Sequence, residues 1–147
     1  MIKVDLQSFE QSYHSGNVTG IICLELETGA YPDAAWSDFP VILLNWWIDA
    51  YLELAISDID EVKWSFMDGP YGVILSKNVG GDSSLGFDYE NLKNDLLDVA
   101  DKVIAHCCGH RMLTPDLSAL RVNAAKLRAS QTAGRITVFV CRESGRQ

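Results

Sequence analysis

The sequence predicts a single α+β domain over residues 1–147, in which a mostly antiparallel, twisted sheet of four to six strands packs against a buried central helix and two further helices. Segments with strand and helix periodicity follow one another in the order β(β)–α–β–β–α–α–β. Two of the strands adjoin as a hairpin, which is typical of α+β folds rather than of doubly wound parallel sheets. A length of 147 residues with 48% hydrophobic residues suits one domain with one core.

The N-terminal part predicts one or two strands. Apolar residues alternate over residues 2–9, which indicates a strand, although residues 7–12 fit the start of a helix equally well. The turn residues 14–17 come next. The run Gly20–Glu27 then places Ile22 and Leu24 on one face and Glu25 on the other, as in a half-buried strand that Thr28-Gly29 ends.

A long apolar helix is predicted from about Asp38 to Ile56. Ser37 or Asp38 is expected to cap its first turn, where Pro40 is tolerated. Its polar residues recur at a spacing of four and make one narrow stripe: Asn45, Asp49 and Glu53. A helix that is apolar around most of its circumference is a buried one, so we interpret it as the central helix.

Two short alternating runs, residues 62–67 and 71–75, flank the turn Asp68-Gly69-Pro70 and predict a β-hairpin. Residues 79–86 are rich in Gly and Ser and indicate a loop with a short strand at its end. Among the aromatic residues, Trp46, Trp64 and Phe66 are expected in the core.

Two amphipathic helices and a strand complete the chain. The first helix, residues 89–108, has an apolar stripe at spacings of three and four, and Gly109 is expected to end it. Thr114-Pro115-Asp116 has the pattern of a helix start. The buried stripe of that helix is predicted to contain Leu117, Leu120, Ala124 and Leu127. Residues 136–140 alternate as a last strand.

The charge is strongly acidic and unevenly distributed. The formal net charge is −8, with 4 basic and 18 acidic residues in 1–101 against 8 and 2 in 102–147. This balance excludes a strongly basic nucleic-acid-binding domain. No apolar run is long enough to span a membrane, and residues 1–5 lack a secretory signal pattern. We therefore expect a cytoplasmic protein with reduced cysteines that binds neither membrane nor nucleic acid.

The segment His106-Cys107-Cys108-Gly109-His110 is the one stretch that suggests a metal or redox site. Cys107 projects toward the apolar stripe of the predicted helix, whereas Cys108 lies about 100° away around it. The four side chains therefore do not converge on one tetrahedral ion, and we expect a packed helix end without a metal.

Other catalytic patterns are missing from the sequence. A thiolate nucleophile needs a base, yet nothing places His14, His106 or His110 beside Cys23 or Cys141. Neither glycine-rich nucleotide motif occurs. We expect no enzyme activity and no cofactor.

Three stretches of the chain carry a family resemblance: Tyr31-Pro32 with Trp36-Ser37-Asp38-Phe39, Leu44-Asn45-Trp46-Trp47, and Phe66-Met67-Asp68-Gly69-Pro70-Tyr71. Over about residues 18–77 this layout resembles small acidic immunity proteins of bacterial contact-dependent growth inhibition and related polymorphic toxin systems. The resemblance implies a protein that binds the toxic C-terminal domain of a delivered effector and blocks its active site. Many such toxins are basic nucleases.

The leading hypothesis is therefore an immunity protein that neutralises a cognate toxin domain by a non-catalytic protein–protein interaction. Loop carboxylates would attract a basic partner, and two aromatic residues beside loops would supply contact area. The predicted partner-binding residues are Asp33, Trp36, Asp58, Asp60, Glu61, Tyr71 and Asp82. The alternatives are a cysteine- or metal-dependent enzyme centred on residues 106–110, and a homo-oligomeric structural or regulatory subunit.

Overall fold

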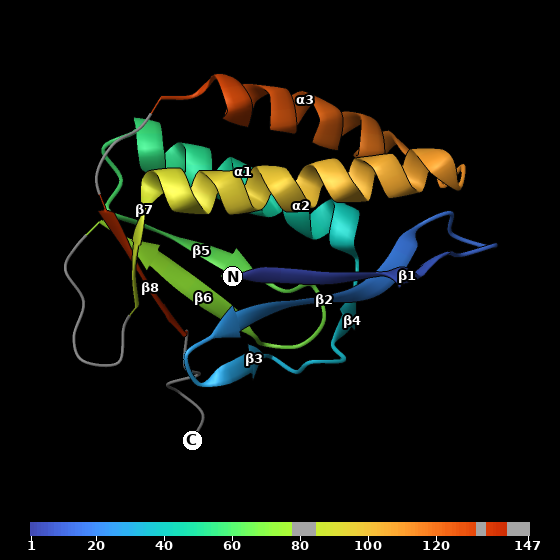
Figure 1. The fold of residues 1–147 in the computed structure, drawn as a ribbon, viewed down its shortest axis with the longest axis horizontal. Helices are drawn as coiled ribbons and strands as arrows, with labels where there is room; N and C mark the ends of the chain where they lie inside the picture. Colours follow the sequence, from blue (N-terminus) through green and yellow to red (C-terminus); the bar gives the residue numbers. More distant parts are fainter. Residues whose placement is uncertain (78–84, 132–134, 141–147) are drawn as a thin grey trace.

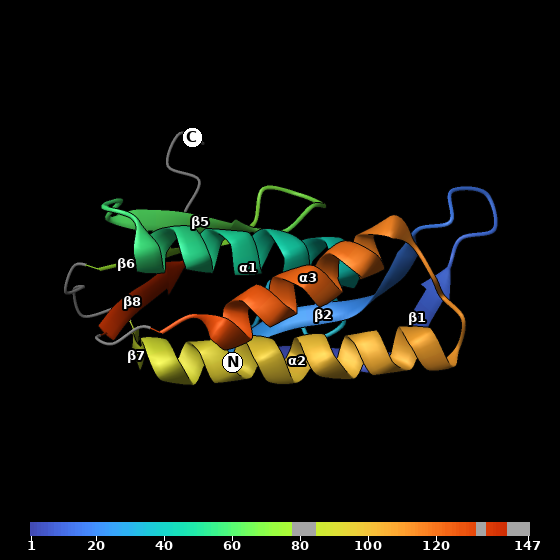
Figure 2. The ribbon, with the colours of Figure 1, turned by 90° about the horizontal axis from the view of Figure 1, so that it is seen from above.

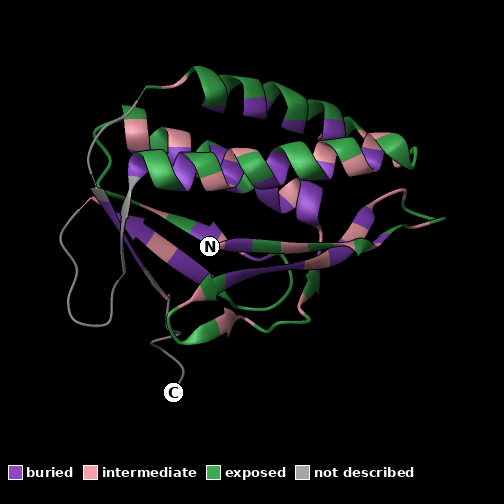
Figure 3. Cartoon of the chain, viewed as in Figure 1, coloured by how far each residue is buried: buried purple, intermediate pink, exposed green. Residues whose placement is uncertain are grey.

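Three helices cover one side of the strands in the computed structural model, which describes residues 1–77, 85–131 and 135–140 (Figure 1). The elements are β1 (Ile2–Gln11), β2 (Val18–Leu26), β3 (Gly29–Tyr31), β4 (Ser37–Asp38), α1 (Pro40–Ile56), β5 (Glu61–Ser65), β6 (Gly72–Ser76), β7 (Leu85–Asp88), α2 (Tyr89–Gly109), α3 (Pro115–Ala129) and β8 (Arg135–Val140). Seen from above, α3 crosses over the space between α1 and α2 (Figure 2). The helices bury their inner faces and expose their outer faces (Figure 3).

The strands form two four-stranded antiparallel sheets. The first sheet has the order β1-β2-β3, with β4 also pairing with β2, and the second has the order β5-β6-β8-β7. The α+β class with antiparallel pairing is confirmed. The strands do not form the single sheet of four to six strands that was predicted but are divided between two sheets, because periodicity within a strand carries no information on its neighbours.

The strand alternative for the N-terminal segment is confirmed by β1, which pairs with β2 from Ile2↔Leu24 to Gln11↔Val18. The register shifts between Asp5 and Glu10. Within this irregular stretch the Ser8 hydroxyl accepts a hydrogen bond from the Ile21 amide (2.8 Å) and donates one to the Asp5 carbonyl (2.6 Å). Strand β1 forms an edge of the first sheet.

Strand β2 ends before Thr28-Gly29 as predicted, and these residues lie at the turn of a second hairpin, formed by β2 and β3. Leu26 pairs with Gly29, so that β3 returns along β2, and β4 pairs with β2 farther along through Gly20↔Asp38. Strands of two or three residues are too short to produce a readable alternation, which is why the sequence indicated only a loop here.

Helix α1 begins with Pro40 in its first turn, after an N-cap, Phe39, that offers no side-chain hydrogen bond. The expected cap by Ser37 or Asp38 is therefore wrong. Both residues belong to β4, and the Asp38 carboxylate accepts hydrogen bonds from the Phe39 amide (2.8 Å) and the Trp36 indole (2.9 Å).

The middle of α1 provides the centre of the core, where the helix contacts β2, β5, α2 and α3. Trp47 stacks on Trp64 with ring centroids 5.1 Å apart and an interplanar angle of 9°. The Trp64 indole donates to the carbonyl of Trp47, and the Trp47 indole donates to that of Ser65, both at 3.0 Å. Both tryptophans are fully buried, so their polar atoms are satisfied without water.

The polar stripe of α1 does not face water throughout. Asn45 is buried, donates to the Asp116 carbonyl (2.9 Å) and accepts from the Asn123 side chain (2.8 Å) on α3. The neighbouring Trp46 lies on the outer side and is 44% exposed, so its predicted core position is wrong. Trp64 and Phe66 are buried as predicted.

The apolar stripes of α2 and α3 are buried as predicted, and the Thr114 hydroxyl caps α3 by accepting from the Leu117 amide (3.0 Å). Helix α2 ends at Gly109 as predicted, but the residue that takes a left-handed conformation beyond it is not this glycine. Arg111 takes the left-handed conformation (φ 56°), and the amides of Arg111 and Met112 bond back to Cys108 and Cys107. None of the described helices is both long and apolar enough to cross a bilayer.

Candidate functional site

Four aromatic side chains from separate segments meet where the two sheets adjoin. We call Tyr31, Trp36, Phe66 and Tyr71 the aromatic cluster. Tyr31 ends β3, Trp36 precedes β4, and the other two flank the turn between β5 and β6. Trp36 meets Tyr71 edge to face, with ring centroids 5.1 Å apart at 78°. Each of the two also contacts another ring of the cluster, at 6.0–6.1 Å.

A tyrosine hydroxyl joins the two sheets at this point. The Tyr31 phenol accepts a hydrogen bond from the Gly72 amide (3.0 Å) and is within 3.1 Å of the Gly72 carbonyl, to which it donates. Gly72 begins β6, next to Tyr71. Through these bonds to Gly72, the first sheet fixes the position of Tyr71, which lies just before the first residue of β6 in the second sheet.

The buried carboxylate of Asp38 holds the other side of the cluster. It is 2% exposed and accepts the Trp36 indole N–H at 2.9 Å and the Asp68 amide at 3.3 Å. One side chain thus fixes both the indole and the turn that carries Tyr71. The sequence does not reveal this role of Asp38, because a carboxylate just before a helix resembles an ordinary cap.

Gly69 makes the close approach of the two rings feasible. Its φ is +80°, a backbone conformation that side chains rarely adopt, and a Cβ there would lie 3.1 Å from two ring carbons of Tyr71. The same Cβ would be 3.5 Å from the Trp36 ring. The predicted turn Asp68-Gly69-Pro70 therefore also shapes the aromatic surface.

The cluster offers a partly exposed aromatic surface with acidic neighbours. Tyr71 is 39% exposed, Trp36 is half-buried, and the carboxylates of Asp33 and Asp68 are exposed. Asp33 also organises its loop, since its side chain accepts from the Ala35 amide at 2.9 Å and its carbonyl from the Trp36 amide at 3.1 Å. Such a surface has aromatic anchors and a polar rim, as protein interfaces have.

The predicted partner-binding residues fall into two groups. The structure brings Trp36 and Tyr71 together beside the turn at Ser65↔Gly72, and Asp33 is linked to Trp36 by the backbone hydrogen bond between them. Asp58, Asp60 and Glu61 are exposed at the opposite end of the same hairpin, where Glu61 pairs with Ser76. The length of β5 separates the two groups by about 13 Å along the strand. Asp82 lies outside the described residues.

The segment His106–His110 is a packed helix end. Cys107 is fully buried, and burial raises the pKa of its thiol to about 11, so that it is not a nucleophile near neutral pH. The Cys108 sulfur accepts a hydrogen bond from the Arg121 guanidinium at 2.7 Å. His106 stacks on His110 at 4.1 Å, and burial followed by the neighbouring imidazole lowers the pKa of His106. The described part of the chain has no group of three or more potential metal ligands.

Comparisons of the chain with protein-family models, with curated proteins and with solved structures found no match.

Proposed function

We propose that this chain is an immunity protein that binds and neutralises a cognate toxin domain, and that the aromatic cluster is the centre of its binding surface. The observation that carries the proposal is the meeting of Trp36 and Tyr71. Two residues singled out beside separate loops share one partly exposed surface. Trp and Tyr are the residues that most often dominate binding energy at interfaces.

Inhibition by this surface would be steric and electrostatic. The aromatic rings would be buried against the toxin, and Asp33 and Asp68 at the rim would favour a basic partner. The net charge of −8 would accelerate the encounter with such a partner, and added salt would reduce that acceleration. We place the protein in the cytoplasm, where a delivered toxin would act.

The test is to co-express this protein with the C-terminal domain encoded by the reading frame immediately upstream of its gene. The proposal predicts that the domain alone arrests growth, that co-expression restores growth, and that the two proteins co-purify. A domain that is harmless alone, or one that arrests growth equally with this protein present, contradicts the proposal.

A matched pair of tyrosine variants locates the surface. Tyr71→Ala is expected to raise the dissociation constant about 30-fold, as for a hot-spot residue. Tyr13→Ala removes a more exposed ring, 97% exposed in the turn between β1 and β2, and is expected to leave binding unchanged. Calorimetric titration measures both. Equal effects of the two variants would show that the aromatic cluster is not part of the interface. They would not contradict the proposal that the protein inhibits a toxin.

A further inference from the structure

Three carboxylates at the aromatic cluster have no cationic partner among the described residues. Asp33 and Asp68 are exposed, whereas Asp38 is 2% exposed and accepts its hydrogen bonds from two backbone amides and an indole. None of the three belongs to an ion pair in this part of the chain. Because buried charges in proteins are normally compensated by an opposite charge, this end of the molecule is suited to receive a cation.

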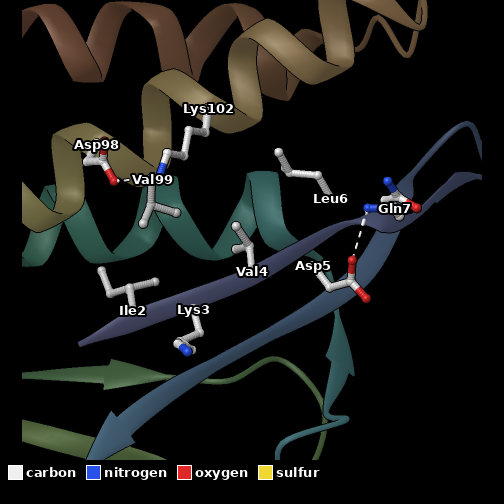
Figure 4. A pocket seen from close by; sticks show the side chains of 9 residues that line it. All are labelled: Ile2, Lys3, Val4, Asp5, Leu6, Gln7, Asp98, Val99 and Lys102. Atoms are coloured by element: carbon white, nitrogen blue, oxygen red, sulfur yellow. Dashed lines mark hydrogen bonds and ion pairs between the residues drawn. The ribbon is translucent and has the colours of Figure 1, made fainter.

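The groove between β1 and α2 presents its charges differently. Figure 4 shows this groove of about 550 Å³, in which Asp98 is paired with Lys102 at 3.0 Å. Lys3, which also lines the groove, is paired with Glu25 at 3.2 Å. The described residues that line the groove include no aromatic ring. Exposed rings and unpaired carboxylates therefore coincide at the aromatic cluster and not at this cavity.

The two exposed carboxylates flank Trp36. The Asp33 carbonyl accepts a hydrogen bond from the backbone amide of Trp36 (3.1 Å), so Asp33 lies beside the backbone of this residue. The Asp68 amide donates to the same Asp38 oxygen that accepts the Trp36 indole, so Asp68 lies beside the ring. A cation on the exposed aromatic surface would thus have a carboxylate near each end of Trp36.

We propose that the aromatic cluster binds an arginine side chain of the toxin domain, with the guanidinium lying on the exposed rings between Asp33 and Asp68. A guanidinium is planar, stacks on aromatic faces and donates paired hydrogen bonds to carboxylates. An ammonium group is a compact and more strongly hydrated charge, so lysine fits this surface less well. An arginine ligand from a toxin presupposes the proposed function and specifies the chemical group that the basic partner inserts.

Lys63 brings a positive charge to the strand next to this surface. A Cβ on Gly72 would lie 2.7 Å from the Cε of Lys63, and Gly72 directly follows Tyr71. The Lys63 side chain is exposed and forms no ion pair with any described carboxylate. Its charge opposes the arrival of a second cation, so Lys63→Met is expected to strengthen the binding of arginine about twofold.

The test uses N-acetyl-arginine methylamide as the probe, titrated into isotopically labelled protein and followed by amide correlation NMR. The indole N–H signal of Trp36, assigned by its loss in Trp36→Phe, reports on the cluster. The amide of Gly16, in the turn between β1 and β2, is the reference. We expect the Trp36 signal to shift with a dissociation constant of about 5 mM at low salt, while the reference stays in place.

Two related probes separate the charge of arginine from its shape. N-acetyl-citrulline methylamide keeps the planar end group but is neutral, and it is expected to bind at least about tenfold more weakly. N-acetyl-lysine methylamide with a free ammonium group is expected to bind about threefold more weakly, at equal chloride concentration. Equal binding of the citrulline probe would overturn the inference, because the positive charge would then contribute nothing.

Matched variants locate the contacts on the protein. Asp33→Asn and Asp68→Asn are each expected to raise the dissociation constant of the arginine probe about threefold, and Tyr71→Leu about fivefold. Asp49→Asn removes an exposed charge from the middle of α1 and is the control with unchanged binding. Circular dichroism checks that every variant is folded.

A Trp36 signal that does not shift with up to about 50 mM arginine probe overturns the inference. So does an effect of Asp49→Asn as large as those of Asp33→Asn and Asp68→Asn. If co-expression restores growth although the arginine probe does not bind, the arginine contact alone is wrong. If the probe binds but the upstream domain is not neutralised, the proposed function is wrong and the guanidinium site remains.

Discussion

The indole of Trp36 and the phenol of Tyr71 meet edge to face, 5.1 Å apart, although they belong to the connections of two different sheets. The relationship depends on three supports that lie outside the rings themselves. The Asp38 carboxylate fixes the indole, the Gly72 backbone is bonded to Tyr31, and Gly69 leaves space for both rings. The surface is therefore formed before any partner arrives, which lowers the entropic cost of binding.

Gly69→Ala is expected to destabilise the protein more than the same change at Gly16. Both glycines have left-handed φ values, +80° and +75°, so both variants lose about 1 kcal/mol to backbone strain. At Gly69 the new methyl also approaches the Tyr71 ring, which adds about 1 kcal/mol. A Cβ at Gly16 meets nothing within 4 Å. Urea denaturation measures the difference, and equal losses would contradict the close approach.

Asp38→Ala is expected to lower the free energy of unfolding by about 3 kcal/mol. The variant leaves the Trp36 indole and the amides of Phe39 and Asp68 without their acceptor in a buried site. Asp38→Asn retains one acceptor oxygen and is expected to cost about half as much. Chemical denaturation followed by far-ultraviolet circular dichroism tests the expected order of stability, in which the wild type exceeds Asp38→Asn and Asp38→Ala is the least stable. The order would reverse if burial of the charge were the dominant unfavourable effect.

The buried amide pair between α1 and α3 predicts a non-additive double mutant. Asn45→Leu leaves the Asn123 amide without its acceptor, and Asn123→Leu leaves the Asn45 side-chain carbonyl without its donor. Each variant is therefore expected to lower the free energy of unfolding by about 2 kcal/mol. The double variant replaces both polar groups with apolar ones and is expected to be more stable than the sum of the singles implies. Thermal unfolding of all four proteins completes the cycle. Additive losses would show that the two side chains are not coupled.

Local patterns predicted the elements whose neighbours are close in sequence. The hairpin around Asp68-Gly69-Pro70 and the stripes of α2 and α3 follow from turn chemistry and periodicity. The inward position of Asn45, next to the exposed Trp46, depends on α3, and the role of Asp38 depends on the turn at Asp68. Both α3 and that turn are far along the chain from these residues. The sequence predicts Trp36 and Tyr71 as interface residues beside two separate loops, but it does not predict the aromatic cluster that they form. Their contact required knowing that two sheets adjoin.

Cys107 is expected to make stability fall in alkaline solution. Its pKa is raised from 9.0 to about 11 by burial and then by Cys108, so the folded state holds its proton where the unfolded state has lost it. The contribution is complete below pH 9 and is lost as pH rises toward 11, amounting to at most about 3 kcal/mol. Denaturation from pH 8 to 10.5 is expected to show a shallower decline for Cys107→Ala.

Cys108→Ala is the control for this slope, because it keeps the buried thiol and removes only the smaller of the two contributions to the raised pKa of Cys107, so that most of the decline is expected to remain. Cys23 and Tyr89, whose pKa values burial also raises, contribute a decline of the same sign in all variants. An unchanged decline in Cys107→Ala would show that another group carries the alkaline dependence.

The stacked indoles of Trp47 and Trp64 equip the molecule with an intrinsic optical probe. Two nearly parallel chromophores 5.1 Å apart couple their electronic transitions, so their circular dichroism differs from that of two isolated tryptophans. The coupling requires α1 to rest on β5, and it disappears when that contact opens, even where each element stays formed. Docking of the helix can thus be followed spectroscopically and separately from secondary structure, without any label.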